Sequence, residues 1–258
     1  MDQSQARPWR TVEELVEIGF HRSRVVMMNE IHDGLLRCPR TRITGQRILP
    51  TAHRLGVRHL AMEALYSPAF AKEVNDSRQL PDEEDSYLAQ SEMRAFIQNA
   101  LDLGWTLIAY EADFTVTPPN LSQREEISWR EEMQARNLTA ALEDLAGDTK
   151  LLVWCGNNHH TKALVPTSPD HPEERWALMG YHFRSLSGID PFVIDQGGTV
   201  VFPGIPRRPK MHRWLEEVTP TLTAFGGTAG FLKEEAPPCF SCIEGDDACV
   251  ISIDNGME

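Results

Sequence analysis

The chain has 258 residues, of which 41% are hydrophobic and 24% are charged, and its formal net charge at pH 7 is −13. This composition is that of an ordinary globular protein, long enough for one α/β domain or two smaller ones. An acidic chain is poorly suited to nucleic acid, because binding to a phosphate backbone depends on Lys and Arg. We expect it to avoid anionic membrane surfaces as well.

The cellular location is predicted from three negative observations. No apolar run approaches the roughly 20 residues that span a bilayer, and the N-terminal stretch MDQSQARPWRTVEELVEIGF is polar and then amphipathic. That stretch lacks the apolar core and the cleavage site of a signal peptide. The five cysteines are an odd number, which argues against a secreted disulfide framework. We therefore expect a cytoplasmic protein.

Strand-like apolar runs alternate with helical patterns along most of the chain. Runs of this kind are typical of strands buried on both faces of a sheet. Alternation of strand and helix predicts an α/β fold with a largely parallel central sheet flanked by helices. The expected strands are 23–30, 57–65, 105–113, 150–160, 190–196 and 198–204, and the expected helices are 40–56, 84–104 and 120–147.

Proline and glycine mark several boundaries in this pattern. Pro50 is expected to kink or restart the first of these helices, because it cannot donate a backbone hydrogen bond. Gly56 is expected to end that helix. The Pro-rich segments 165–175 and 202–210 are predicted to be loops. We expect one α/β domain over residues 1–204 and an irregular C-terminal extension over residues 205–258, packed on the same domain.

Polar, titratable residues follow each of the first four predicted strands. Ligands bind outside the carboxyl ends of the strands in open α/β sheets, so these residues are expected to meet at one edge. A lone Glu after a strand is usually a helix cap or a solvated loop residue, but four such strand ends in succession favour a shared site. The residues are Asn29, Glu30 and His32; Glu63; Tyr110, Glu111 and Asp113; and Asn157, Asn158, His159 and His160.

Two kinds of chemistry suit such an edge. Crowded carboxylates and imidazoles shift one another's pKa values, which favours general acid–base catalysis near neutral pH. The same residue types bind a divalent metal that lowers the pKa of bound water. Neither a G-x-S-x-G nucleophile motif nor a phosphate-binding glycine loop occurs. Water is therefore the expected nucleophile.

The segments NEIHDG, LAMEAL, YEAD, REEMQARNL and WCGNNHH occur in this order between residues 20 and 200. Together they resemble the superfamily of erythromycin esterases, TIKI proteases and ChaN-like haem-binding proteins, and within it bacterial ChaN-like proteins. The resemblance implies an α/β fold of this type and makes Glu30, His32, Glu63 and His159 the expected catalytic residues. In the esterases similar positions activate water, and in the TIKI proteases they are tied to a divalent metal.

The resemblance extends to neighbouring positions. Arg42 matches a basic residue near the start of the helix after the first strand, and Asn157 precedes the matched histidine. One position departs from the pattern, since Asn29 stands where the superfamily has a glycine. The residues assigned to substrate binding are Arg42, Tyr110, Glu111, Arg130, Asn137 and Asn157.

Three features allow more than one interpretation. Neighbours on an extended segment point to opposite faces, so His159 is expected to reach the site and His160 to pack elsewhere. Arg130 and Asn137 share a helical face that is either solvated, or binds a substrate carboxylate, or orients Glu111. The cluster Cys239, Cys242 and Cys249, with His212 far upstream, is a weak zinc signal, and free cysteines are favoured.

The predicted function is that of a hydrolase-like enzyme acting on an ester or amide of a small molecule or peptide. A divalent metal (Mn, Co, Zn or Fe) held by Glu30, His32, Glu63 and His159 is an expected cofactor, and haem is the alternative. The competing hypotheses are a haem- or metal-binding protein without turnover and a non-catalytic member of the superfamily that binds a small molecule. The sequence indicates no oligomeric state.

Overall fold

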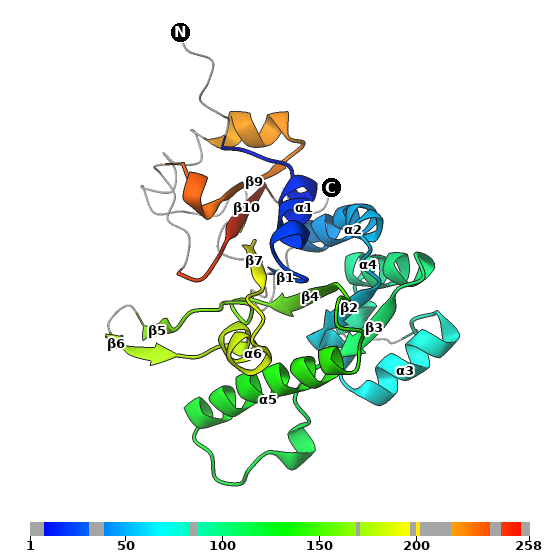
Figure 1. Cartoon of the computed structure of the whole chain (residues 1–258), viewed down its shortest axis with the longest axis vertical. Helices are drawn as coiled ribbons and strands as arrows, with labels where there is room; N and C mark the ends of the chain where they lie inside the picture. The colour runs from blue at the N-terminus through cyan, green and yellow to red at the C-terminus, as the bar shows by residue number, and fades with distance from the viewer. Residues whose placement is uncertain are drawn as a thin grey trace.

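The computed structural model describes residues 8–30, 39–82, 87–168, 171–196, 200–201, 218–237 and 244–253. A mostly parallel sheet lies at its centre (Figure 1), with strand order β3–β2–β4–β1–β7–β10–β8, and β9 pairs antiparallel with β10. The strands are β1 Val25–Glu30, β2 His59–Met62, β3 Thr106–Ala109, β4 Leu151–Gly156, β7 Phe192–Asp195, β8 Val200–Val201, β9 Thr228–Leu232 and β10 Ala248–Ile253. The predicted α/β class is confirmed.

Helices cover both faces of this sheet (Figure 1). On one face α1, α2, α3 and α4 contribute to the larger apolar core, and on the other face α5 and α6 contribute to a second core. The helices are α1 Val12–Arg22, α2 Pro39–Arg54, α3 Pro68–Ser77, α4 Ser91–Asp102, α5 Gln123–Glu143 and α6 Met179–Ser187. Short 3-10 turns are η1 Glu63–Leu65, η2 Tyr87–Ala89, η3 Phe114–Val116 and η4 Lys233–Glu235.

Local sequence explains where the helix nearest the N-terminus and the first strand form. Thr11 and Glu14 form a capping box that satisfies backbone donors at the start of α1. The apolar residues of α1 recur at helical spacing and are buried. All six residues of β1 are buried, as expected for a central strand covered on both faces.

The strand register brings the carboxyl ends of the strands to one edge. Glu30 is opposite Gly156, and Met62 is opposite both Trp154 and Ala109. The described residues that follow Met62, Ala109 and Gly156 therefore leave the sheet at the same edge, as the sequence predicted. This edge is where the candidate site lies.

Several local predictions need correction. Helix α2 is continuous through Pro50, so the helix does not restart there, while a kink at Pro50 stays a prediction. The segment predicted as a Pro-rich loop at 165–175 contains an antiparallel hairpin, β5 Val165–Ser168 and β6 His171–Trp176, apart from the main sheet. The expected irregular extension supplies β9 and β10 to the main sheet. Of the predicted strand 198–204, the described residues are Val200 and Val201.

The strand at one end of the sheet, β3, has its outer edge covered in part by a side chain. The amide of Asn75 on α3 accepts from the backbone N–H of Leu107 at 2.8 Å and donates to its carbonyl oxygen at 2.8 Å. This arrangement replaces the two hydrogen bonds that a further strand would make and so prevents another strand from pairing at this position.

None of the described helices combines the length and apolar character needed to cross a membrane.

Candidate active site

A histidine and a carboxylate form an ion pair at the carboxyl edge of the sheet. His159 lies in the turn after β4, and its Nδ1 is 2.5 Å from Oε1 of Glu131 on α5. The other oxygen of Glu131 accepts a hydrogen bond of 2.7 Å from the backbone N–H of Met179, at the start of α6. Glu131 is therefore fixed at both oxygens, and it fixes the orientation of the imidazole in turn.

The protonation state of His159 follows from its surroundings. Burial alone lowers the pKa of His159, but the nearby carboxylates of Glu63 and Glu131 outweigh burial, against an opposing effect of Arg130, and raise the pKa to about 9. At neutral pH the ring is an imidazolium. The pairing of Met62 with Trp154 brings the ends of β2 and β4 to the same edge of the sheet, and Glu63 is the first of the influences that raise the pKa of His159.

A second ion pair orients the carboxylate after β3. Arg130 donates from Nε to Oε1 of Glu111 at 3.0 Å and from a terminal nitrogen to Oε2 at 2.5 Å. Gln134 donates to Oε1 at 3.0 Å, and the side-chain amide of Asn137 donates to the backbone oxygen of Glu111 at 2.9 Å. This face of α5 contacts Glu111, and its role toward a substrate carboxylate stays a prediction.

Glu30 is in a different environment from Glu63 and His159. Its carboxylate accepts from Nε of Arg42 at 2.7 Å and from the indole N–H of Trp154 at 3.3 Å. Glu30 and Arg42 are each 1% exposed. The guanidinium of Arg42 also donates to Gln90 and lies over the ring of Tyr87, 4.8 Å from its centroid. Arg42 is thus engaged by residues of the core, while its predicted role toward substrate stays a prediction.

Tyr110 and Asn157 are tied to the backbone around them. The hydroxyl of Tyr110 is buried and donates to the carbonyl oxygen of Trp154 at 3.0 Å, and burial raises the pKa of Tyr110 well above its usual value. The backbone N–H of Asn157 donates to the carbonyl oxygen of Glu30 at 2.8 Å. These contacts hold the ends of β1, β3 and β4 together at the carboxyl edge of the sheet.

The backbone is strained close to two of the predicted catalytic residues. Tyr66, three residues after Glu63, has φ 56° and ψ −50°, and Ser67 donates across it to the carbonyl oxygen of Leu65 at 2.5 Å. This is a γ-turn of the rare, strained kind. Asn157, two residues before His159, has φ 39°. Strained backbone of this sort clusters at functional sites.

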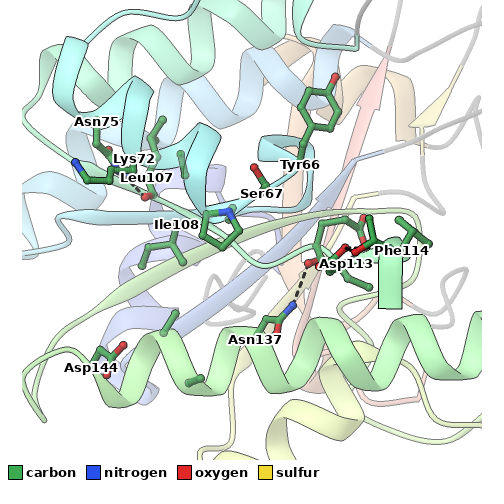
Figure 2. Close-up of a pocket in the computed structure, with 18 of the residues that line it drawn as sticks. Tyr66, Ser67, Lys72, Asn75, Leu107, Ile108, Asp113, Phe114, Asn137 and Asp144 are labelled. Carbon is green, nitrogen blue, oxygen red and sulfur yellow. Dashed lines mark hydrogen bonds between the residues drawn. The ribbon is translucent and has the colours of Figure 1, made fainter. Parts of the chain in front are cut away.

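A pocket of about 1030 Å³ adjoins Glu111. Figure 2 shows it between α3 and α5, over β3, with Asn137 from α5 and Tyr66 and Ser67 from the other side. Its lining includes Ile108 and Phe114, and the ring of Phe114 is 52% exposed. Glu63 and His159 are not among its lining residues. Glu111 lines the pocket, and its partner Arg130 lies near enough to His159 to influence the pKa of the imidazole.

The residues expected to hold a divalent metal are only partly assembled among the described residues. His159 carries a carboxylate on Nδ1, which is the arrangement usual for a metal-ligating histidine. Glu30 is instead engaged by Arg42, and no described group of three metal-ligating residues includes Glu30, Glu63 or His159. His32, Asp33 and Cys38 lie outside the described residues. The divalent-metal site predicted from the sequence and the haem alternative both stay predictions.

Glu131 was not predicted from the sequence to belong to the site. Its neighbour Arg130 was selected by helical spacing, and only the position of α6 reveals that Glu131 is buried against His159 and Met179. The prediction that His159 and His160 diverge agrees with their different contacts, although they lie in a turn rather than a strand. Cys239, Cys242 and His212 lie outside the described residues, and Cys155 is a buried free cysteine of the core.

The fold and its edge define an α/β protein with a mostly parallel sheet and a polar network beyond the carboxyl ends of its strands. No family model and no curated protein sequence matches the chain. A solved structure described as bacterial protein toxins has a TM-score of 0.50 and 10% identity, covering 72% of this chain and 36% of that chain. This chain therefore spans about a third of the length of that toxin structure, and the likeness is one of fold.

Two further structures are more distant. The type III effector HopBA1 has a TM-score of 0.48 and 12% identity, with 99% of this chain and 100% of that chain covered. A mutant erythromycin esterase in its open conformation has a TM-score of 0.34 and 14% identity, with 83% of this chain and 55% of that chain covered. Membership of the erythromycin esterase superfamily stays a prediction from the sequence motifs.

Proposed function

We propose that the chain is a hydrolase-like enzyme that activates water at the carboxyl edge of its sheet and cleaves an ester or amide of a small molecule or peptide. The observation that carries the proposal is the Glu63–His159–Glu131 arrangement. It combines a partly buried, oriented imidazole with a second carboxylate close enough to raise the pKa of that imidazole. Paired acid and base groups with displaced pKa values are typical of catalytic sites.

The protonation states suggest how the work is divided. His159 is an imidazolium at neutral pH, so it serves as the proton donor, and Glu63 serves as the proton acceptor. In this scheme Glu63 takes a proton from water while the water oxygen attacks the carbonyl carbon. His159 then donates its proton to the leaving oxygen or nitrogen as the ester or amide bond breaks. Glu131 holds the ring and stabilises its charge.

The remaining predicted residues have supporting roles in this proposal. Glu30 and Arg42 act as positioning residues, because each satisfies the other inside the core and the chain continues from Glu30 toward His32. Arg130 and Asn137 hold Glu111 at the mouth of the pocket, where the substrate would lie. His32 keeps the catalytic role that the resemblance implies.

The test is a hydrolysis screen with matched variants. The wild-type chain is offered a panel of p-nitrophenyl esters and fluorogenic peptides, and kcat/KM is compared with that of Glu63→Gln and His159→Gln. Loss of general acid–base catalysis lowers the rate roughly 10²–10⁴-fold. Arg136→Ala is the control, because Arg136 lies on α5 in an exposed ion pair with Glu132. Folding of each variant is checked by circular dichroism.

The proposal predicts that both site variants lose activity and the control does not. Unchanged turnover in folded Glu63→Gln and His159→Gln would refute the assignment of these residues. Absence of hydrolysis across both substrate classes by the wild-type chain would count against a hydrolase.

A further inference from the structure

A second group of metal-ligating side chains lies buried beside the turn that carries His159. It consists of His160, Asp195, Asp246 and Cys249, each at most 3% exposed. The two carboxylates and the thiol offer ligand atoms that all lie within 4.8 Å of one another. Nε2 of His160 lies 3.7 Å from Oδ1 of Asp195 and 3.6 Å from Oδ1 of Asp246.

Neighbouring strands hold this cluster in place. Asp195 ends β7 and is directly opposite Cys249 of β10, while His160 follows β4. Between β4 and β7 lies β1, whose Asn29 donates from its amide to Oδ1 of Asp195 at 2.7 Å. Hydrogen bonds of this type orient metal-ligating carboxylates in proteins.

His160 points to a ligand independently of the acidic residues. Its ring is 0% exposed, and Nε2 has no hydrogen-bond partner within the described part of the chain. The distances of 3.6 and 3.7 Å to the two carboxylates exceed the roughly 2.7–3.2 Å of a hydrogen bond.

We propose that His160, Asp195, Asp246 and Cys249 bind one zinc ion. Zinc bonds of about 2.0–2.3 Å in a tetrahedron place ligand atoms roughly 3.3–3.8 Å apart. The two histidine–carboxylate distances fall in this range, and the ligand atoms of Asp195, Asp246 and Cys249 lie within 4.8 Å of one another. A mixed nitrogen, oxygen and sulfur set favours zinc over magnesium or calcium, which prefer oxygen ligands alone.

The consequence for the fold is a tie between distant parts of the chain. The ion would join the end of β7 and the start of β10 to the turn after β4, where His160 directly follows His159. A closed four-ligand zinc site of this kind is structural and does not bind substrate. The inference stands independently of the proposed hydrolase, because none of its four ligands is assigned to that reaction.

The test uses metal content and cobalt spectroscopy on the full chain. Protein expressed with zinc and purified without chelator is expected to hold about one zinc per chain by elemental analysis. Cobalt(II) exchanged into the site is expected to give a near-ultraviolet band from sulfur-to-cobalt charge transfer. Cys249→Ala is expected to abolish this band, and Asp246→Asn to weaken metal binding at least about tenfold.

Two control variants separate this site from others. Cys155→Ala removes a buried cysteine of the core, and Glu63→Gln alters the proposed active site; both are expected to retain the metal. Zinc is also expected to raise the Tm of the wild-type chain, a readout that requires no variant to fold. Folded wild-type protein that shows neither bound metal nor a zinc-dependent Tm would overturn the proposal. So would a cobalt–thiolate band that survives in Cys249→Ala, an affinity for cobalt that Asp246→Asn leaves unchanged, or metal that is lost in Glu63→Gln and retained in Cys249→Ala.

Discussion

His159 is expected to make the free energy of unfolding depend on pH. In the folded chain burial lowers its pKa, but Glu63 and Glu131 outweigh burial and raise the pKa to about 9, whereas an unfolded histidine titrates near 6.5. Because the folded pKa is the higher one, the stabilising contribution is complete below about pH 6.5 and is lost as the pH rises through about 9. A separation of two to three pKa units corresponds to roughly 3 kcal/mol.

The measurement compares urea unfolding of the wild-type chain and His159→Gln at about pH 6 and about pH 10. All other titrating groups are shared, so the difference between the two proteins isolates His159. That difference is expected to fall by roughly 3 kcal/mol across the interval. Glu131→Gln and Glu63→Gln, each compared with its own His159→Gln double variant, are expected to reduce this fall.

A difference in unfolding free energy that stays constant between these pH values would refute the reasoning. So would a ring pKa near 6.5, measured by NMR on the folded chain. Either result would mean that the carboxylates do not hold His159 as a cation, and the proton-donor role proposed for it would fail with the same observation.

Three further predictions concern stability and can be checked by chemical denaturation. Arg42→Ala removes one member of the buried ion pair with Glu30 and is expected to lower the free energy of unfolding by about 3–5 kcal/mol. Arg47→Ala on the same helix removes an exposed ion pair with Glu13 and is expected to lower it by at most about 1 kcal/mol. Equal losses in the two variants would contradict this prediction. Gly180→Ala is expected to lower the free energy of unfolding by about 1–3 kcal/mol or more, because the added carbon would lie 2.0 Å from the backbone oxygen of His160. In the control variant Gly147→Ala the added carbon meets nothing within 4 Å, so the free energy of unfolding is expected to change by no more than about 0.5 kcal/mol. Asn75→Ala removes the two hydrogen bonds at the edge of β3 and is expected to lower the free energy of unfolding by about 1–3 kcal/mol. An unchanged midpoint of the denaturation curve would show that these two hydrogen bonds do not stabilise the fold.

The parts of the fold that could be predicted are those that the sheet buries on both faces. The strands β1, β2, β3, β4 and β7 all lie inside predicted apolar runs, because a central parallel strand leaves a continuous apolar signature. Gly56 and Gly104 follow the ends of α2 and α4 with φ of 90° and 81°, conformations that favour glycine.

The parts that could not be predicted lack such a signature. The hairpin strand β6 has the sequence HPEERW and is largely exposed, so neither periodicity nor apolar content marks it. Strand β9, TAGFL, contains Gly230, where an added Cβ would lie 2.6 Å from the backbone oxygen of Cys249. Glycine there permits close strand packing, yet in the sequence it resembles a break.

The site was predictable to the extent that it depends on strand ends. Glu63, Glu111 and His159 were selected because parallel strands place the residues that follow them at one edge, and their catalytic and binding roles stay predictions. Glu131 and Asp195 were not singled out, because their roles depend on which helix or strand lies opposite them. A carboxylate that orients a histidine lies at no fixed sequence distance from it, because the two residues belong to different secondary-structure elements.

The two adjacent histidines depend on one close approach between α6 and the turn after β4. The backbone N–H of Gly180 donates to the carbonyl oxygen of His159 at 2.8 Å, and an added Cβ on Gly180 would lie 2.0 Å from the carbonyl oxygen of His160. One residue earlier, Met179 donates to the carboxylate of Glu131. The start of α6 therefore fixes both the imidazole assigned to proton transfer and the imidazole proposed to bind zinc. Any side chain at Gly180 should disturb both sites together, whereas changes at Glu63 or Cys249 should disturb one site each.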